Sequence, residues 1–180
     1  MDLYEALAGR RSIRRYTGDP VSEGTLQKLL DAARIAPSWS NKQCWSFIVV
    51  REQSRKEKLA ASMPDENPCK GAIAGVPVVI VLCADPAASG RPDGKEYYLL
   101  DAGLAMQQLM LAAHAEGLGS CWVAWFDEAV AREACRVPEP YRVVAFTPLG
   151  VPARQPKPRP RKNLEEIVFS EEWGNTGVPG

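Results

Sequence analysis

Apolar positions near the start of the chain recur at helical spacing. In residues 2–9, Leu3, Ala6 and Leu7 fall on one helical face, and Gly9 ends the pattern. We therefore expect a short amphipathic helix at the beginning of the chain.

A better-defined helix is predicted after Ser22. Ser22 is a favourable N-cap, and Val21 and Leu26 are spaced to pack on each other as a hydrophobic staple. The helix should end before Pro37. Its apolar stripe continues through Leu29, Leu30 and Ala33.

Continuous apolar runs then predict strands. Residues 46–50, SFIVV, read as a strand, and the charged residues 53–63 read as an exposed helix. The run VPVVIVLCA at residues 76–84 is too short to cross a bilayer and predicts a buried strand.

The longest helical pattern covers residues 97–117 and is apolar on nearly every side. Such a helix must be covered on every side, either at the centre of the fold or by a partner subunit. Its main polar interruptions are Asp101, Gln107, Gln108 and Glu116.

Shorter elements complete the core. Residues 120–126, SCWVAWF, predict a strand, residues 127–135 a helix, and residues 141–150 a strand. Together these elements predict an α+β fold in which residues 1–150 form the core.

Residues 151–180 differ in composition from the core. Prolines at positions 152, 156, 158 and 160 favour an extended segment with low conformational entropy. Large apolar side chains nevertheless follow, so we expect this C-terminal arm to wrap around a second subunit. These side chains are Leu164, Ile167, Val168, Phe169 and Trp173.

Composition and charge exclude several classes of protein. Apolar residues make up 46% of the chain, and 22 basic residues balance 22 acidic ones, so no global field favours nucleic acid or an anionic membrane. The N-terminus lacks an apolar signal core. The five cysteines form no CxxC pair and there is one histidine, which argues against zinc and favours reduced thiols in a cytoplasm.

Common catalytic motifs are missing from the sequence. There is no GxSxG, P-loop or HExxH motif, and GLGSCW at residues 117–122 lacks the third glycine of a dinucleotide fingerprint. His114 lies within the apolar helix and is expected to be a hydrogen-bonded structural residue. If the chain is an enzyme, a cofactor should supply the chemistry, with no catalytic side chain and no metal.

Three segments instead carry candidate binding groups. The basic stretches RRSIRRY (residues 10–16) and KPRPRK (157–162) could converge on one phosphomonoester, because arginine forks and a serine hydroxyl suit a terminal phosphate. They could equally be two unrelated solvated patches. Residues 36–47, APSWSNKQCWSF, suit a planar heterocycle or form an ordinary helix-to-strand connection.

In this order, the segments resemble the FMN-dependent nitroreductase family. RRSIRRY is similar to its RRSxRxF/Y element and APSWSNKQCW to its PSxxNxQPW loop. GLGSCWVAWF is similar to its GLGTCWIG-type strand, and PLGVPARQPKPRPRK to its PxGxPxxxPxxR segment. Cys44 stands where the family usually has proline, which puts the rigidity of the loop in question.

The resemblance implies a set of FMN-binding residues. Arg10, Ser12, Arg159 and Arg161 would hold the phosphate, and Arg14 would approach the flavin pyrimidine near N1 and O2. Arg11 belongs to the same candidate set, although Arg11 and Arg15 are expected to support the fold or the surface. Further candidates are Pro37, Ser38, Trp39 and Asn41 from the neighbouring subunit, Gln43 supporting that loop, Asn67 near the pyrimidine ring, and the backbone of Ala124 and Trp125 facing N5.

The implied fold is a central mixed or antiparallel sheet flanked by helices, in a homodimer with FMN at the interface. The implied activity is ping-pong transfer from NADH or NADPH to a nitroaromatic, a quinone or a similar acceptor. A reductive dehalogenase, an enoate-type reductase or a non-catalytic FMN-storage protein on the same scaffold are alternatives. A nucleic-acid-binding module that uses RQPKPRPRK is disfavoured by the zero net charge.

Overall fold

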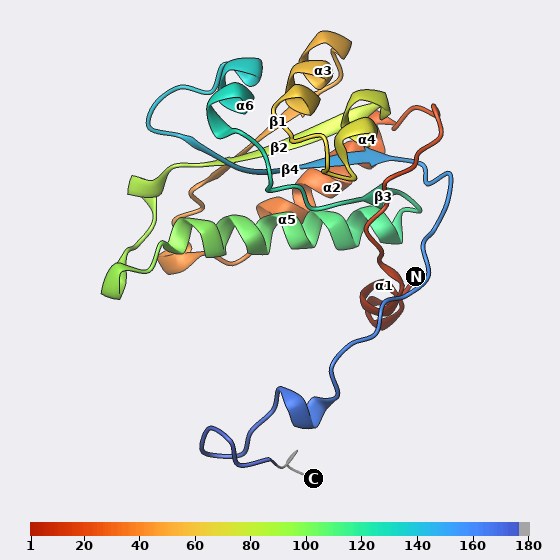
Figure 1. The fold of residues 1–180 in the computed structure, drawn as a ribbon. Coiled ribbons are helices and arrows are strands. Elements are labelled where there is room, and N and C mark those ends of the chain that lie inside the picture. Colours follow the sequence, from red (N-terminus) through yellow and green to blue (C-terminus); the bar gives the residue numbers. More distant parts are fainter. Residues whose placement is uncertain (177–180) are drawn as a thin grey trace.

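A four-stranded antiparallel sheet lies at the centre of the chain (Figure 1); the computed structural model describes residues 1–176. The inner strand β2 (Val78–Ala84) is buried along its whole length, as its continuous apolar sequence predicts. The predicted sheet is therefore confirmed, and its strands are all antiparallel. In spatial order the strands are β1 (Trp45–Val50), β2 (Val78–Ala84), β4 (Arg142–Gly150) and β3 (Gly119–Ser120).

Helices cover both faces of the sheet (Figure 1). Alternate side chains of β2 enter two separate cores, because successive residues of a strand point to opposite faces: Ile80 and Leu82 pack with α2 and α5, whereas Val79 and Val81 pack with the other helices. The first face carries α2 (Glu23–Arg34) and α5 (Tyr97–Ala115), and the second carries α3 (Gln53–Ala61), α4 (Lys70–Gly75) and α6 (Glu128–Cys135). Short 3-10 turns are η1 (Trp39–Asn41), η2 (Pro86–Ala88), η3 (Pro92–Gly94) and η4 (Leu164–Glu166).

The predicted start of α2 is confirmed in detail. The Ser22 hydroxyl accepts a hydrogen bond from the backbone N–H of Thr25 at 3.1 Å, and Val21 and Leu26 are both buried in the first core. The helix ends at Arg34, three residues before Pro37.

The first helix, α1 (Leu3–Gly9), also forms, but residues 1–176 leave most of its apolar face uncovered. Leu3 and Leu7 are 64% and 51% exposed, and only Ala6 of the predicted stripe is buried. On the long helix α5, Leu99, Leu100 and Leu104 are exposed, so the covering of this side by a partner subunit stays a prediction.

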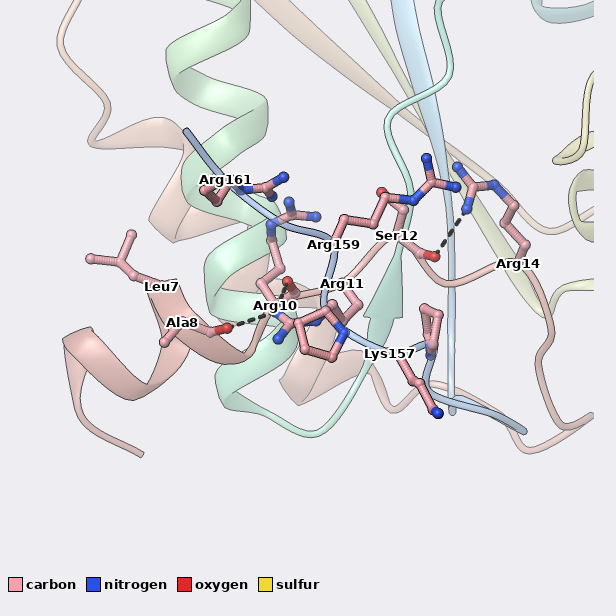
Figure 2. Close-up of a pocket in the computed structure, with 11 residues that line it drawn as sticks. Leu7, Ala8, Arg10, Arg11, Ser12, Arg14, Lys157, Arg159 and Arg161 are labelled. Atoms are coloured by element: carbon pink, nitrogen blue, oxygen red, sulfur yellow. Dashed lines mark hydrogen bonds between the residues drawn. The ribbon is translucent and has the colours of Figure 1, made fainter. Parts of the chain in front are cut away.

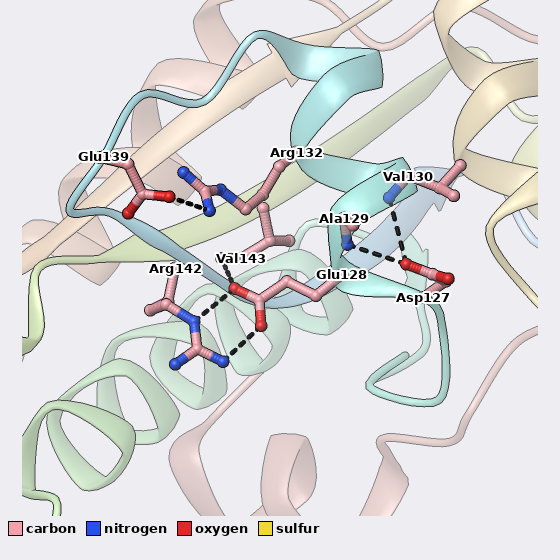
Figure 3. Close-up of polar contacts among 8 residues, drawn as sticks. All are labelled: Asp127, Glu128, Ala129, Val130, Arg132, Glu139, Arg142 and Val143. Carbon is pink, nitrogen blue, oxygen red and sulfur yellow. Dashed lines mark hydrogen bonds and ion pairs between the residues drawn. The ribbon is translucent and has the colours of Figure 1, made fainter.

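Polar contacts fix the predicted helix α6 against β4 (Figure 3). The Asp127 carboxylate caps the helix by accepting the N–H groups of Ala129 and Val130 at 2.9 and 3.2 Å. Glu128 accepts from Arg142 Nε at 2.7 Å and from the Val143 N–H at 3.0 Å. The hydrogen bond from Arg142 holds the pKa of Glu128 below its usual range.

One sequence expectation for the core is corrected, and one helix was missed. The strand expected over residues 120–126 was wrong beyond Ser120: β3 has two residues, followed by an isolated bridge between Val123 and Phe146. The ladder breaks because the Cys121 N–H donates to the Thr147 hydroxyl, a side chain, at 3.0 Å. Helix α4 was not anticipated.

After β4 the chain leaves the core as an exposed segment (Figure 1). Residues 153–163 carry no regular secondary structure; η4, a turn at residues 172–175 and an isolated bridge between Phe169 and Thr176 follow. Leu164, Ile167 and Trp173 are exposed. Residues 177–180 of the predicted arm lie outside the described range, and its wrapping of a second subunit stays a prediction. No helix in residues 1–176 has the length and apolar character needed to span a membrane.

Candidate cofactor site

The two basic stretches meet at one cavity of about 500 Å³ (Figure 2). Six cationic side chains and the Ser12 hydroxyl line it together with Leu7, Ala8 and two prolines. No salt bridge to any of the six cations is found among residues 1–176, so their positive charge remains available to an anion. The cations are Arg10, Arg11, Arg14, Lys157, Arg159 and Arg161.

Backbone pairing explains why the stretches converge. The Thr17 N–H donates to the Val151 carbonyl at 2.9 Å, and the Ala153 N–H donates to the Arg15 carbonyl at 3.0 Å. Gln155 Nε2 then reaches the Gly9 carbonyl at 3.2 Å. This pairing aligns the start of the C-terminal segment with the N-terminal basic stretch.

Backbone bridges hold the N-terminal stretch beside the segment of Ser120 and beside Pro152. Ile13 is buried and its N–H donates to the Ser120 carbonyl at 2.9 Å, while Ser12 and Arg14 on either side line the cavity. Gly119 permits this approach: a Cβ there would come within 2.8 Å of the Ile13 side chain. Arg14 also donates to the Ser12 carbonyl at 3.4 Å (Figure 2).

The Arg11 side chain turns back toward the end of α1. Its guanidinium donates to the carbonyls of Ala8 and Arg10 at 2.6 and 2.8 Å, at the end of α1 (Figure 2). A cation at a helix C-terminus satisfies unpaired carbonyls and interacts favourably with the helix dipole. Arg11 therefore supports the cavity wall through α1.

The loop of residues 37–43, PSWSNKQ, lies away from the arginine cavity. It is held in an uncommon backbone conformation, with positive φ at Ser40, Asn41 and Gln43. The Gln43 N–H donates to the Ser38 hydroxyl at 2.9 Å, and the Gln43 amide donates to Asn41, so Gln43 supports the loop. None of the loop candidates lines the arginine cavity; these are Pro37, Ser38, Trp39, Asn41 and Gln43.

A buried carboxylate, missed in the sequence analysis, anchors this loop. Asp101 of α5 is 2% exposed and accepts the Trp39 N–H at 2.9 Å and the Ser89 hydroxyl at 2.7 Å. The Cys44 thiol also lies 3.7 Å from this carboxylate, which contributes after burial to raising the pKa of Cys44 to about 11. The sequence signal that could have indicated this anchoring role was an acidic residue inside an otherwise apolar helix.

Replacing Asp101 with asparagine should destabilise the protein. The amide keeps one acceptor for the Trp39 N–H but turns its NH₂ toward the Ser89 hydroxyl and the Cys44 thiol. A buried hydrogen-bond mismatch costs about 1–3 kcal/mol, which lowers the Tm of a chain of this size by roughly 2–4 °C per kcal/mol. Thermal unfolding compares this variant with Asp65→Asn, whose parent side chain is 94% exposed. Equal Tm values for the two variants would contradict the anchoring role.

The three remaining candidates are Asn67, Ala124 and Trp125, and two of them are hydrogen-bonded to each other. Asn67 donates its amide to the Trp125 carbonyl at 3.1 Å and accepts the Cys69 N–H at 3.0 Å. Ala124 adjoins Trp125 in sequence but lines a different cavity, which also contains Glu128. The structure thus brings Asn67 and Trp125 together, outside the wall of the arginine cavity.

His114 packs against the end of α1. A Cβ at Gly9 would come within 2.5 Å of the His114 Nε2. No hydrogen bond from the imidazole to another protein group is found among residues 1–176, and the half-buried ring leaves the expected hydrogen-bonded role a prediction. Burial, and then the charges of Arg10 and Arg11, lower the pKa of His114.

This lowered pKa predicts a pH effect on stability. The unfolded chain, in which histidine titrates near about 6.5, binds more protons than the folded chain, so folding loses stability as pH falls through that value. His114→Gln should remove this contribution. Urea unfolding between about pH 5 and pH 8 should therefore show the difference between wild type and variant changing with pH. A constant difference would contradict the assignment.

The chain is similar to proteins of known family over most of its length. The model of the nitroreductase family matches residues 7–151. A crystal structure of a nitroreductase family protein from Clostridium novyi NT is 37% identical with a TM-score of 0.83, covering 98% of this chain and 97% of that one. An FMN-dependent nitroreductase from Clostridium difficile R20291 is 26% identical with a TM-score of 0.82, covering 94% and 100%.

The chain is also similar in sequence to an NADH dehydrogenase. The NADH dehydrogenase of Thermus thermophilus is 33% identical over 200 residues, covering 94% of this chain and 96% of the relative. The matched region includes the N-terminal arginines from Arg10 to Arg14, the 37–43 loop and the whole sheet. This chain belongs to the nitroreductase family of oxidoreductases.

Proposed function

We propose that the protein is an FMN-dependent NAD(P)H oxidoreductase. The single observation that carries this proposal is the arginine cavity, whose six cations have no acidic partner among the described residues. That charge and the arginine forks fit a terminal phosphate. Arg10, Ser12, Arg159 and Arg161 would hold the phosphate, with Lys157 adding charge.

The remaining residues would orient the cofactor ring. The chemistry that FMN would supply is two-electron transfer from NADH or NADPH to an acceptor such as a nitroaromatic or a quinone. Arg14, next to the phosphate cations, would stabilise negative charge on the pyrimidine side. Asn67 and the Trp125 carbonyl, which are hydrogen-bonded to each other, would form the other wall. No side-chain acid or base is assigned.

A homodimer with a shared site is part of the proposal. Loop 37–43 is anchored at Asp101, whereas the arginine stretch packs near His114, thirteen positions further along α5. At 1.5 Å per residue, this separates the two anchors by roughly 20 Å along the helix. A second copy would bring its own loop to the arginine side.

Exposed apolar side chains support the same assembly. They occur on α1, on α5 and after residue 163, where a partner subunit could cover them. A cytoplasmic location is also proposed, since all five cysteines are free thiols. The exposed side chains are Leu3, Tyr4, Leu7, Leu99, Leu100, Leu104, Leu164, Ile167 and Trp173.

An absorbance titration tests the proposal. The purified protein should bind added FMN, and the flavin absorbance band should bleach when NADH or NADPH is added anaerobically and return with an acceptor. Binding without bleaching by either nucleotide would favour the storage protein. Failure to bind FMN would overturn the proposal.

A further inference from the structure

Two buried thiols lie in direct contact behind the arginine cavity. Cys69 Sγ and Cys121 Sγ are 3.1 Å apart, and each residue is 2% exposed. This separation is about 1 Å longer than a disulfide bond of roughly 2.05 Å. Cys69 is the N-cap position of α4 and Cys121 follows β3, so residues 52 positions apart have been brought together by the fold.

The pair is electrostatically unlike the other buried cysteines. Cys83 is a thiol whose pKa burial raises to about 12. At Cys121, the hydrogen bond donated by the Cys69 thiol lowers the pKa, and Arg14, the Ser12 hydroxyl and Arg10 act in the same direction. The same hydrogen bond and burial raise the pKa of Cys69.

This arrangement separates two chemical roles. A thiolate is the nucleophilic form of cysteine, and positive neighbours favour it. Cys121 is therefore the attacking sulfur, and Cys69 is a protonated thiol held in contact with it. A peroxide-sensitive cysteine commonly stands next to a second cysteine that resolves its sulfenic acid.

Residues of the arginine cavity wall adjoin the segment that carries Cys121. Ser12 and Arg14 line the cavity, and the positive charge of Arg14 favours the thiolate form of both cysteines by lowering their pKa. Ser12 also forms a parallel bridge with Ser120, the residue before Cys121.

We propose that Cys69 and Cys121 form a redox-active dithiol that hydrogen peroxide converts into an intrachain disulfide. The Cys121 thiolate attacks one peroxide oxygen, the O–O bond breaks, and Cys121 sulfenic acid forms while the other oxygen leaves as water after taking a proton. The Cys69 sulfur then attacks Cys121 Sγ and the S–O bond breaks. The departing hydroxide takes the Cys69 proton and leaves as water. Two thiols lose two electrons, and one peroxide yields two waters.

The disulfide would connect two parts of the candidate site. Asn67 accepts the Cys69 N–H and donates to the Trp125 carbonyl, so the cross-link would join this pair to the segment after β3. This inference does not rest on FMN binding, because both thiols and the oxidant act without it.

Thiol counting and peptide mapping test the proposal on the full chain. The protein is reduced, desalted, exposed to hydrogen peroxide, and then alkylated in denaturant and weighed by mass spectrometry. Two of the five thiols should become unavailable, one intrachain cross-link should join Cys69 to Cys121, and dithiothreitol should restore both thiols. Cys83→Ser is the matched control, since Cys83 is equally buried; this variant should still lose two thiols.

Variants identify the attacking sulfur. Cys69→Ser should leave a Cys121 sulfenic acid that dimedone traps, and Cys69→Ala serves as a second variant. If neither variant folds, the wild-type peptide map decides. Loss of no thiols, a cross-link between other cysteines or between chains, or irreversible oxidation of Cys121 without a cross-link would overturn the proposal.

Discussion

Replacing Arg10 and Arg161 together with alanine should strip FMN from the protein. The two side chains come from opposite ends of the sequence and line one cavity (Figure 2). Each charged hydrogen bond to a phosphate contributes about 1.5–3 kcal/mol. Losing both should weaken FMN binding by roughly a hundredfold to ten-thousandfold. Equilibrium titration, followed by the quenching of flavin fluorescence, measures the change in Kd.

A matched variant controls for the loss of charge. Arg15→Ala/Arg154→Ala removes two arginines from the same two segments, but neither parent side chain lines the arginine cavity. This control should retain FMN within a few-fold of wild type. If the Arg10/Arg161 variant binds FMN as tightly as the control, the phosphate site lies elsewhere.

Removing the C-terminal segment should have a similarly large effect. A chain that stops after Ala153 keeps the backbone pairing of residues 15–17 with 151–153 but loses Lys157, Arg159 and Arg161. It also loses the exposed apolar residues Leu164, Ile167 and Trp173. We expect it to lose FMN binding and to sediment as a monomer or to aggregate.

A smaller truncation separates the effect on FMN binding from the effect on self-association. A chain that stops after Lys162 keeps every cation of the arginine cavity and removes the part of the segment that carries its large apolar side chains. Sedimentation velocity should show weaker self-association than wild type, because stable assemblies generally bury roughly 2,000 Å² or more. Self-association and FMN binding equal to wild type in the chain ending at Ala153 would contradict a role for the segment in either.

Local patterns were sufficient to predict most of the fold. The Ser22 cap, the Val21–Leu26 staple and the continuous apolar run of β2 each depend on neighbours within a few residues, and each is present. The convergence of the two basic stretches was one of two open readings, and backbone pairing across more than a hundred residues decided it.

Features that depend on distant partners could not be read from the sequence. The strand over residues 120–126 fails because Cys121 bonds to the Thr147 side chain, 26 residues away. Asp101 was visible only as a polar interruption in a helix; its role appears once Trp39 and Ser89 lie beside it. The Cys69–Cys121 contact likewise requires the packing of α4 against the segment after β3.

The most direct test of a shared FMN site uses mixed dimers. One parent carries Arg10→Ala/Arg161→Ala, and the other carries Ser38→Asp/Asn41→Asp. In the second parent, the aspartate at position 38 still accepts the Gln43 N–H, and aspartate at position 41 tolerates the positive φ found there. Each parent alone should purify without flavin. The two are co-expressed with different affinity tags and purified over both.

Mixed dimers should regain one flavin per dimer, measured by absorbance of the doubly purified protein. In them the intact arginines of one chain face the intact loop of the other. If the arginines and the loop serve FMN within a single chain, every site in the mixed dimer carries a defect. Doubly purified dimers without flavin would therefore contradict the shared site.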